Sequence, residues 1–463
     1  MTRAALAAAL GALTVSALAA LGPRYGGQLR VGVLDLPGSL APARPCGLGE
    51  RLVLGLVHEP LLRYSPDGRL LPGLVDRWTA SADGRAWTLH LRDGASFHDG
   101  TPVTAQDLER TLRRFVRSPS VAARHLQRSL APPTDPAATD ADQLGLLAPS
   151  SQELVLRVNA DVSEPLAALA SPAAAVTSAS GSGAGPFAPT LWTPARRLDA
   201  AAFGAHGRGR PFLDRIEVSA FASQEALGEA YRAGRVDLIP TDAAPGSANA
   251  VLLLVLDPKQ PPFDVVANRA AARASLDRPE RLGPLTPAAD TRRLLLPPVV
   301  LPATGTEPAA SDEPTRGSGA VELVVSTDVK PLLSQRIVAL LAATGFSVRV
   351  RPLAPAQALA APGAARLLLW FPEIPEPSIA LEELRSLAPA PEAAVRALAD
   401  ARAAVDPDRR RVLLLESAEA TQRAGLLLPL ANLPISFGER AGLHGAATDA
   451  KGQLLLEDAW REP

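Results

Sequence analysis

The 463-residue chain has few of the residues that form disulfides and metal sites. Cys46 is its only cysteine, which excludes an intrachain disulfide. The six histidines are scattered, without a Cys/His cluster or an H-E-x-x-H motif, so we expect no metal site and no cofactor. Nucleophile-elbow and P-loop motifs are also absent, and no set of acids and bases suggests catalysis. We therefore expect a protein that is not an enzyme.

The chain also has almost no excess of either charge and few aromatic side chains. The formal net charge is −1, which does not favour nucleic acid as a partner. Lysine occurs only three times and tyrosine three times, and aromatic residues make up 4% of the chain. Each tryptophan or phenylalanine near a possible site is therefore informative.

A long apolar run occurs only once, at residues 4–21, directly after Arg3. With the small-x-small sequence at Ala17–Ala19, this run predicts a secretory signal peptide over residues 1–20. A retained membrane anchor is the alternative, because the run is close to the length of a spanning helix. Cys46 lies too far beyond the run to be the lipidated cysteine of a mature N-terminus. We expect an exported, soluble, monomeric protein of the periplasm.

Strand and helix patterns alternate along the chain, which predicts an α/β protein. Gln28–Leu34 and Ala86–Arg92 alternate apolar and polar residues as half-buried strands do, and Thr104 begins a helix with a T-x-x-D cap. A helix is also predicted at Glu50–Val57. Residues 118–150 lose the pattern, so surface structure is expected there.

The second half contains a β–α–β unit. Glu322–Val325, Leu332–Ala343 and Ser347–Arg351 predict a strand, a helix and a parallel strand. Val251–Leu256 is an unbroken apolar run, typical of a central strand in a covered sheet. Pro284–Gly319 is rich in Pro and Ala without apolar periodicity and predicts a long irregular linker.

Several short motifs occur in the order found in one protein family. They are PGLVDRW at 72–78, WTLHLRDGASFHDGTPVTAQDL at 87–108, GPF at 185–187, GRPFLDRIEV at 209–218, AGRVD at 233–237, PPF at 261–263 with Asp277-Arg278, and WFPEIPEP at 370–377. Together they resemble the extracellular solute-binding proteins of family 5, the receptors of ABC importers for peptides, nickel and related solutes. The segment at 87–108 identifies the family, but its own residues have structural roles in packing and turns.

The resemblance implies an α/β fold of the periplasmic-binding-protein type II, a two-lobed clamshell with a small extra subdomain. We expect lobe I to comprise residues 26–46, 177–256 and 432–463, an inserted subdomain 47–176, and lobe II 257–431, with 284–319 as its irregular linker. Val251–Leu256 and Leu428–Ile435 are the candidate hinge strands.

The resemblance also implies a ligand-binding region. In peptide-binding relatives a carboxylate in the W-x-x-D loop pairs with the ammonium group of the ligand, and this role falls on Glu373. The alternative is that Glu373 is an exposed loop acid. Trp370 and Phe371 would form a wall, and Leu48 would contact the ligand backbone unless it is a simple loop residue. Phe187 is a further candidate, with a core position as its alternative.

The function that follows is a periplasmic receptor that binds a peptide or peptide-like solute and delivers it to ABC permease subunits. Two departures from the family keep alternatives open: the region after Asp277-Arg278 is short, and tyrosines that line the pocket in relatives are scarce. The chain could be a divergent paralogue that serves as a sensor or interaction protein. It could also bind a nickel chelate or an oligosaccharide. A hydrolase has only the export signal in its favour.

Overall fold

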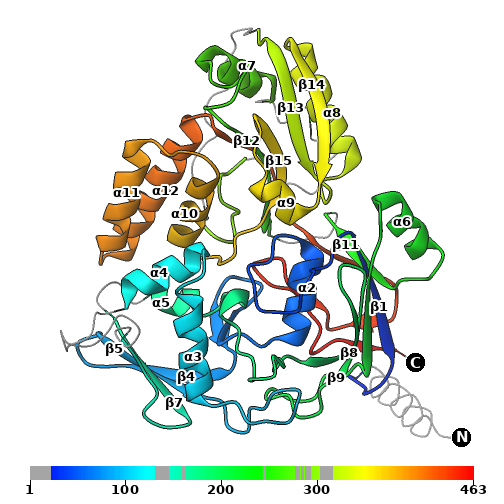
Figure 1. Ribbon diagram of the computed structural model, residues 1–463, viewed down its shortest axis with the longest axis vertical. Coiled ribbons are helices and arrows are strands. Elements are labelled where there is room, and N and C mark those ends of the chain that lie inside the picture. The colour runs from blue at the N-terminus through cyan, green and yellow to red at the C-terminus, as the bar shows by residue number, and fades with distance from the viewer. Residues whose placement is uncertain are drawn as a thin grey trace, which may run out of the picture.

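The computed structural model describes residues 22–130, 145–158, 163–242, 247–276, 293–302 and 316–462, together with Leu282 and Thr286. Its described strands form three larger sheets, each with its own packed core (Figure 1). The predicted signal peptide and the Asp277-Arg278 motif lie outside the described residues.

A six-stranded sheet forms the first body. Its strand order is β17 (Ser436–Glu439), β11 (Leu238–Thr241), β1 (Gln28–Val33), β10 (Arg215–Ala220), β9 (Arg197–Ala202) and β8 (Phe187–Thr193). Helix α2 (Leu48–Val57) shares the core of this sheet, and α6 (Gln224–Arg232) precedes β11. Two small ribbons complete the C-terminal part, and they pair β18 (Leu443–His444) with β21 (Trp460–Arg461) and β19 (Ala447–Thr448) with β20 (Leu454–Leu455).

A five-stranded sheet forms the second body. Its order is β14 (Phe346–Leu353), β13 (Gly319–Ser326), β15 (Ala365–Trp370), β12 (Ala250–Leu256) and β16 (Leu427–Leu433). Strands β13 and β14 are parallel and joined by α8 (Pro331–Ala343), so the predicted β–α–β unit is confirmed. Every residue of β12 is buried because helices cover both faces. One core includes α7 (Val266–Leu276) and α8, and the other includes α9 (Pro355–Ala360), α10 (Pro377–Leu387), α11 (Glu392–Ala403) and α12 (Pro407–Arg423).

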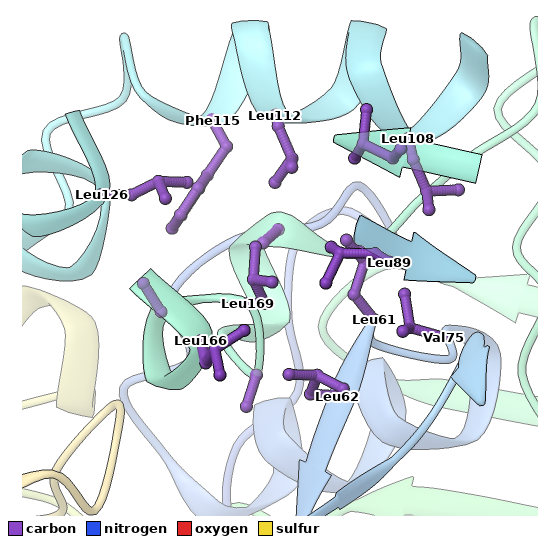
Figure 2. Close-up of a cluster of buried hydrophobic side chains, with 14 of the residues drawn as sticks. Leu61, Leu62, Val75, Leu89, Leu108, Leu112, Phe115, Leu126, Leu166 and Leu169 are labelled. Carbon is purple, nitrogen blue, oxygen red and sulfur yellow. The ribbon is translucent and has the colours of Figure 1, made fainter. Parts of the chain in front are cut away.

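The third body contains a four-stranded antiparallel sheet. Its order is β4 (Val75–Ala80), β5 (Ala86–Leu91), β7 (Glu153–Arg157) and β6 (Leu146–Leu147). Around it lie β2 (Leu62–Tyr64), β3 (Leu70–Pro72), α3 (Ala105–Phe115), α4 (Val121–Ser129), α5 (Ser163–Ala168) and a 3₁₀ turn, Pro172–Ala174. Figure 2 shows how Leu108, Leu112 and Phe115 of α3 point into this core. The predicted cap is confirmed, because Thr104 and Asp107 form a reciprocal capping box at the start of α3.

The core of the third body continues across a boundary between bodies. Ile374 and Ile379, which lie beside and within α10 of the second body, belong to the same buried cluster as Leu126 of α4. In Figure 1, α4 and α5 lie directly below α10. We call this contact the α4/α10 seam.

Three predictions differ from the structure. Residues 118–150 do not consist of surface structure alone, because α4 buries Val121 and Leu126. The helix is too short for its helical repeat of apolar residues to be recognised in the sequence. The segment Val251–Leu256, which we placed in lobe I, pairs with β15 and β16 and so lies in the five-stranded sheet. Residues 293–302 of the predicted linker are irregular as expected, but Leu295, Leu296 and Leu301 are buried in a core. The remaining domain boundaries stay predictions.

Candidate functional site

An apolar crevice lies between the six-stranded and the five-stranded sheet. It encloses about 190 Å³ and is lined from both sides. Its apolar lining includes Leu34, Leu48, Leu227, Ile239, Leu252, Val329, Leu333, Leu369, Leu433 and Ile435. Three acids, Asp35, Asp242 and Asp328, and one base, Lys330, also line it. A concave, mostly apolar space with a few polar groups is the usual form of a small-molecule site.

Asp35 lies where β1 ends and holds the start of α2. Its carboxylate accepts hydrogen bonds from the backbone N–H groups of Gly49, at 3.3 Å, and Glu50, at 3.4 Å. A side chain at position 49 would meet the Asp35 carbonyl oxygen at 1.8 Å, so the close approach requires glycine. Burial and the charge of Glu50 raise the pKa of Asp35 to about 6. This contact places Leu48, the first residue of α2, at the crevice wall.

Asp328 occupies the corresponding place in the second body, two residues after the end of β13. Both of its carboxylate oxygens are buried, and neither is hydrogen-bonded at an ordinary distance and angle within the part of the chain that the structure describes. Burial raises the pKa of Asp328 to about 7, and the charge of Asp35 adds to this effect. The nearby Ser326 hydroxyl and Val329 amide counteract it only in part. Lys330, next along the turn, forms an ion pair with Asp242 of the first body.

The loop after β15 holds Glu373 in a buried position, so the alternative of an exposed loop acid is wrong. Glu373 is 0% exposed. The Ser120 hydroxyl donates to its two oxygens at 3.1 and 3.0 Å, and the Ser171 hydroxyl donates to one of them. Arg44 Nε lies 3.5 Å from the other oxygen and 3.3 Å from Glu383. The chain itself therefore supplies partners for the Glu373 carboxylate in this conformation.

Trp370 and Phe371 are nearly fully buried, and their side chains belong to different cores. Trp370 packs among β12 and the helices of the second body, and its indole N–H finds no hydrogen-bond partner among the described residues. The Phe371 ring lies under the guanidinium of Arg51, 5.0 Å from the ring centroid. With Arg44 and Cys46, both aromatic residues line a small cavity of about 20 Å³. They are thus positioned beside the crevice rather than inside it.

Arg51 connects α2 to the same loop. It is 2% exposed and donates to the carbonyl oxygens of Phe371 and Pro372, both at 3.4 Å. Burial lowers its pKa to about 10. A buried guanidinium that binds carbonyl groups fixes the loop against the first body.

Phe187 is 0% exposed and lies in the core of the six-stranded sheet, beside residues of α2. Phe187 thus occupies the core position that was the alternative to a place in the ligand pocket. Of the five predicted ligand-contacting residues, the structure therefore brings Leu48 to the crevice, Trp370 and Phe371 to the small cavity, Glu373 against Ser120 and Ser171, and Phe187 to a core. Their roles toward a ligand stay predictions.

A charged cluster closes the outer part of the α4/α10 seam. Glu382 of α10 accepts from Arg402 at 2.5 Å and from Arg128 of α4 at 2.8 Å, and His125 Nε2 lies 2.8 Å away. Burial alone would raise the pKa of Glu382, but the hydrogen bonds from His125 and Arg128 hold it well below its usual range. The seam thus joins the third body to the second through a partly buried carboxylate and its donors.

The residues that sequence reasoning missed come from separate segments. Asp35 and Asp328 could have been noticed as acids that follow a buried strand, because ligands bind at the carboxyl ends of strands in α/β sheets. Nothing in the sequence pairs Ser120 or Ser171 with Glu373. Among the described residues, no group of three or more His, Cys, Asp or Glu could hold a metal ion. Within the same residues, no helix is long and apolar enough to cross a membrane.

Comparison with known proteins gives a match over residues 69–283 to the model of bacterial extracellular solute-binding proteins, family 5. The periplasmic murein peptide-binding protein MppA of Escherichia coli is 42% identical over 84 residues, which are 18% of this chain and 16% of that protein. The nickel-binding periplasmic protein of Escherichia coli is 45% identical over 51 residues, 11% of this chain and 10% of that protein. These alignments span under a fifth of the length of the curated relatives.

Solved structures match nearly the whole chain. The murein tripeptide-binding protein MppA of Escherichia coli has a TM-score of 0.80 and 18% identity, and the match covers 95% of this chain and 99% of that one. The binding protein DppA of Helicobacter pylori, solved with the peptide STSA, has a TM-score of 0.77 and 16% identity, covering 94% and 99%. The chain therefore has the two-lobed fold of periplasmic binding proteins, as predicted.

Proposed function

We propose that this chain, which matches the family 5 model of bacterial extracellular solute-binding proteins over residues 69–283, is the solute-binding component of an ABC importer. It binds a peptide or peptide-like solute between its two lobes, the bodies of the six-stranded and the five-stranded sheet. Exported by its N-terminal signal, it acts in the periplasm as a monomer and a binding protein rather than an enzyme. The permease subunits of the inner membrane are its partners.

The crevice carries this proposal, because both lobes line it with apolar side chains and buried acids. A solute in this space contacts both lobes at once and so favours the conformation in which they are close together. Peptide complexes among proteins of the same fold support a peptide as the solute.

The predicted ammonium partner, Glu373, has its carboxylate occupied by Ser120 and Ser171 in this conformation. Both serines belong to the third body. A ligand ammonium reaches Glu373 only if it displaces these hydroxyl groups, which requires movement at the α4/α10 seam. Trp370 and Phe371 would then border the bound solute.

A thermal-shift screen of the purified protein tests the proposal. Short peptides should raise the melting temperature, because a ligand at one hundred times its Kd adds about 2.7 kcal/mol to the free energy of unfolding. Glu373→Gln removes the charge with little change in shape and should weaken binding if Glu373 pairs with the ammonium. Stabilisation by a nickel chelate or an oligosaccharide, and by no peptide, would replace the peptide with that class of solute.

A second candidate is a divergent paralogue that acts as a sensor or interaction protein. The observation in its favour is that internal contacts satisfy Glu373 without a ligand. If no peptide, chelate or sugar stabilises the protein in the screen, this second candidate is preferred over the importer.

A further inference from the structure

The carboxylate of Asp328 has no cationic partner in the described part of the chain, and the nearby Ser326 hydroxyl and Val329 amide offset its burial only in part. Its two oxygens are buried, line the crevice and make no hydrogen bond of acceptable geometry within the described part of the chain. A buried polar group without a partner destabilises the folded protein, and more so when it is charged. Such a group is a reason to look for a partner that comes from outside the chain.

Asp328 does not act as a helix cap that would explain its position. Lys330, not Asp328, precedes the first residue of α8, and the Val329 N–H donates to the Ser326 carbonyl oxygen at 3.0 Å. Lys330 is also engaged, because its ammonium group pairs with Asp242 across the crevice. The cation nearest in sequence to Asp328 thus already has a carboxylate partner.

Asp35 adds a second carboxylate from the opposite lobe. It lines the same crevice, and its charge raises the pKa of Asp328, so the two groups are electrostatically coupled. Both acids lie two residues beyond the carboxyl end of a buried strand, β1 or β13, which is where α/β sheets bind ligands. A cation between them would be held from both lobes.

The surroundings define the kind of cation. The described residues contain no group of three or more metal-ligating side chains, so a divalent metal ion lacks the ligands it needs here. The rest of the crevice is largely apolar, with Leu48, Leu227 and Leu333 among its lining. An organic cation with an apolar body fits both features.

We propose that Asp328, with Asp35 opposite it, binds the protonated amine of an amphipathic solute whose apolar part fills the crevice. This inference rests on the proposed function and deepens it: it assigns the ionic contact to Asp328 in place of Glu373. The amine is the N-terminal ammonium of a short apolar peptide or the amine of a small molecule of similar shape. Because each lobe contributes one carboxylate, the solute also links the two lobes.

Titration calorimetry with trileucine, N-acetyl-trileucine and leucinamide tests the inference on wild type and on Asp328→Asn. Trileucine and leucinamide carry the free amine, whereas acetylation removes its charge. Wild type should prefer trileucine over the acetylated peptide by at least about tenfold, the equivalent of 1.4 kcal/mol. Asp328→Asn should lose most of this preference, because removing either partner removes the same interaction.

Asp83→Asn is the matched control, since Asp83 lies in an exposed turn and its replacement removes the same charge. A circular dichroism melt of each variant verifies that it is folded. If Asp328→Asn keeps the full preference for the free amine, or if Glu373→Gln removes it instead, the inference is overturned while the proposed function stands. If leucinamide binds through Asp328 and trileucine does not bind, the inference stands and the peptide is wrong. If none of the three binds wild type, both fail.

Discussion

Replacing Asp328 with asparagine should stabilise the protein at alkaline pH and leave it nearly unchanged at acidic pH. The pKa of Asp328 rises from 3.8 to about 7 on folding, chiefly because its carboxylate is buried. A raised pKa means that the folded state keeps the proton longer than the unfolded chain does. Protonated Asp328 therefore makes its full contribution to stability below about pH 4, and this contribution is lost as the pH rises through about 7.

The magnitude follows from the shift. A difference of about 3 pKa units corresponds to about 4 kcal/mol at about 1.4 kcal/mol per unit, which is an upper limit for a group that water can reach after a small relaxation. Asparagine has the shape of the protonated acid but cannot ionise. The variant should hence avoid most of this loss above pH 7.

Urea unfolding of wild type and variant at pH 4.5 and pH 8.5 measures the effect. Asp35, with a pKa of about 6, and Glu383, with a pKa of about 7, contribute pH dependence of the same sign, so the difference between the two proteins is the quantity to compare. We expect a gain of about 1–4 kcal/mol at pH 8.5 and of no more than about 1 kcal/mol at pH 4.5, where the unfolded carboxyl is only partly protonated. Equal effects at both pH values, or destabilisation at pH 8.5, would refute the claim that Asp328 is buried and unpartnered.

Two further predictions concern the seam and a core. Glu382→Gln removes the charge that Arg402 and His125 contact, so it should favour separation of α4 from α10 and increase the radius of gyration measured by small-angle scattering. The control, Glu392→Gln at an exposed position, should leave the radius unchanged. An unchanged radius in both variants would show that the Glu382 carboxylate does not hold the seam together. Phe187→Ala should lower the free energy of unfolding by about 3–5 kcal/mol, because the Phe187 ring is fully buried. Leu191→Ala on the same strand should have only a small effect, because Leu191 is half-exposed. A loss below about 1 kcal/mol for Phe187→Ala would contradict a core role.

The elements were predictable where a local pattern decides them. The β–α–β unit around α8, the buried strand β12 and the cap at Thr104 all follow from the period of apolar residues and from turn chemistry. Helix α4 was missed because it has only nine residues, and its buried alanines carry a weak signal. Which sheet β12 joins could not be predicted, because an apolar run shows burial and not the partner strand.

The candidate site was predictable only where the family pattern marks a residue. The loop at Glu373 was found in this way, but its contacts with Ser120 and Ser171 depend on how distant segments pack. Asp35 and Asp328 are nearly 300 positions apart, and only the arrangement of the two sheets brings them to one crevice. A single sequence contains no signal for such a juxtaposition.

The shared core at the α4/α10 seam has a thermodynamic consequence. Ile374 and Ile379 are 0% exposed within the core of the third body, so separating the two bodies transfers their side chains to water. Exposure of apolar surface increases the heat capacity. The equilibrium between joined and separated bodies should therefore vary with temperature along a curve rather than a straight line, as protein unfolding does, although every helix and strand stays intact.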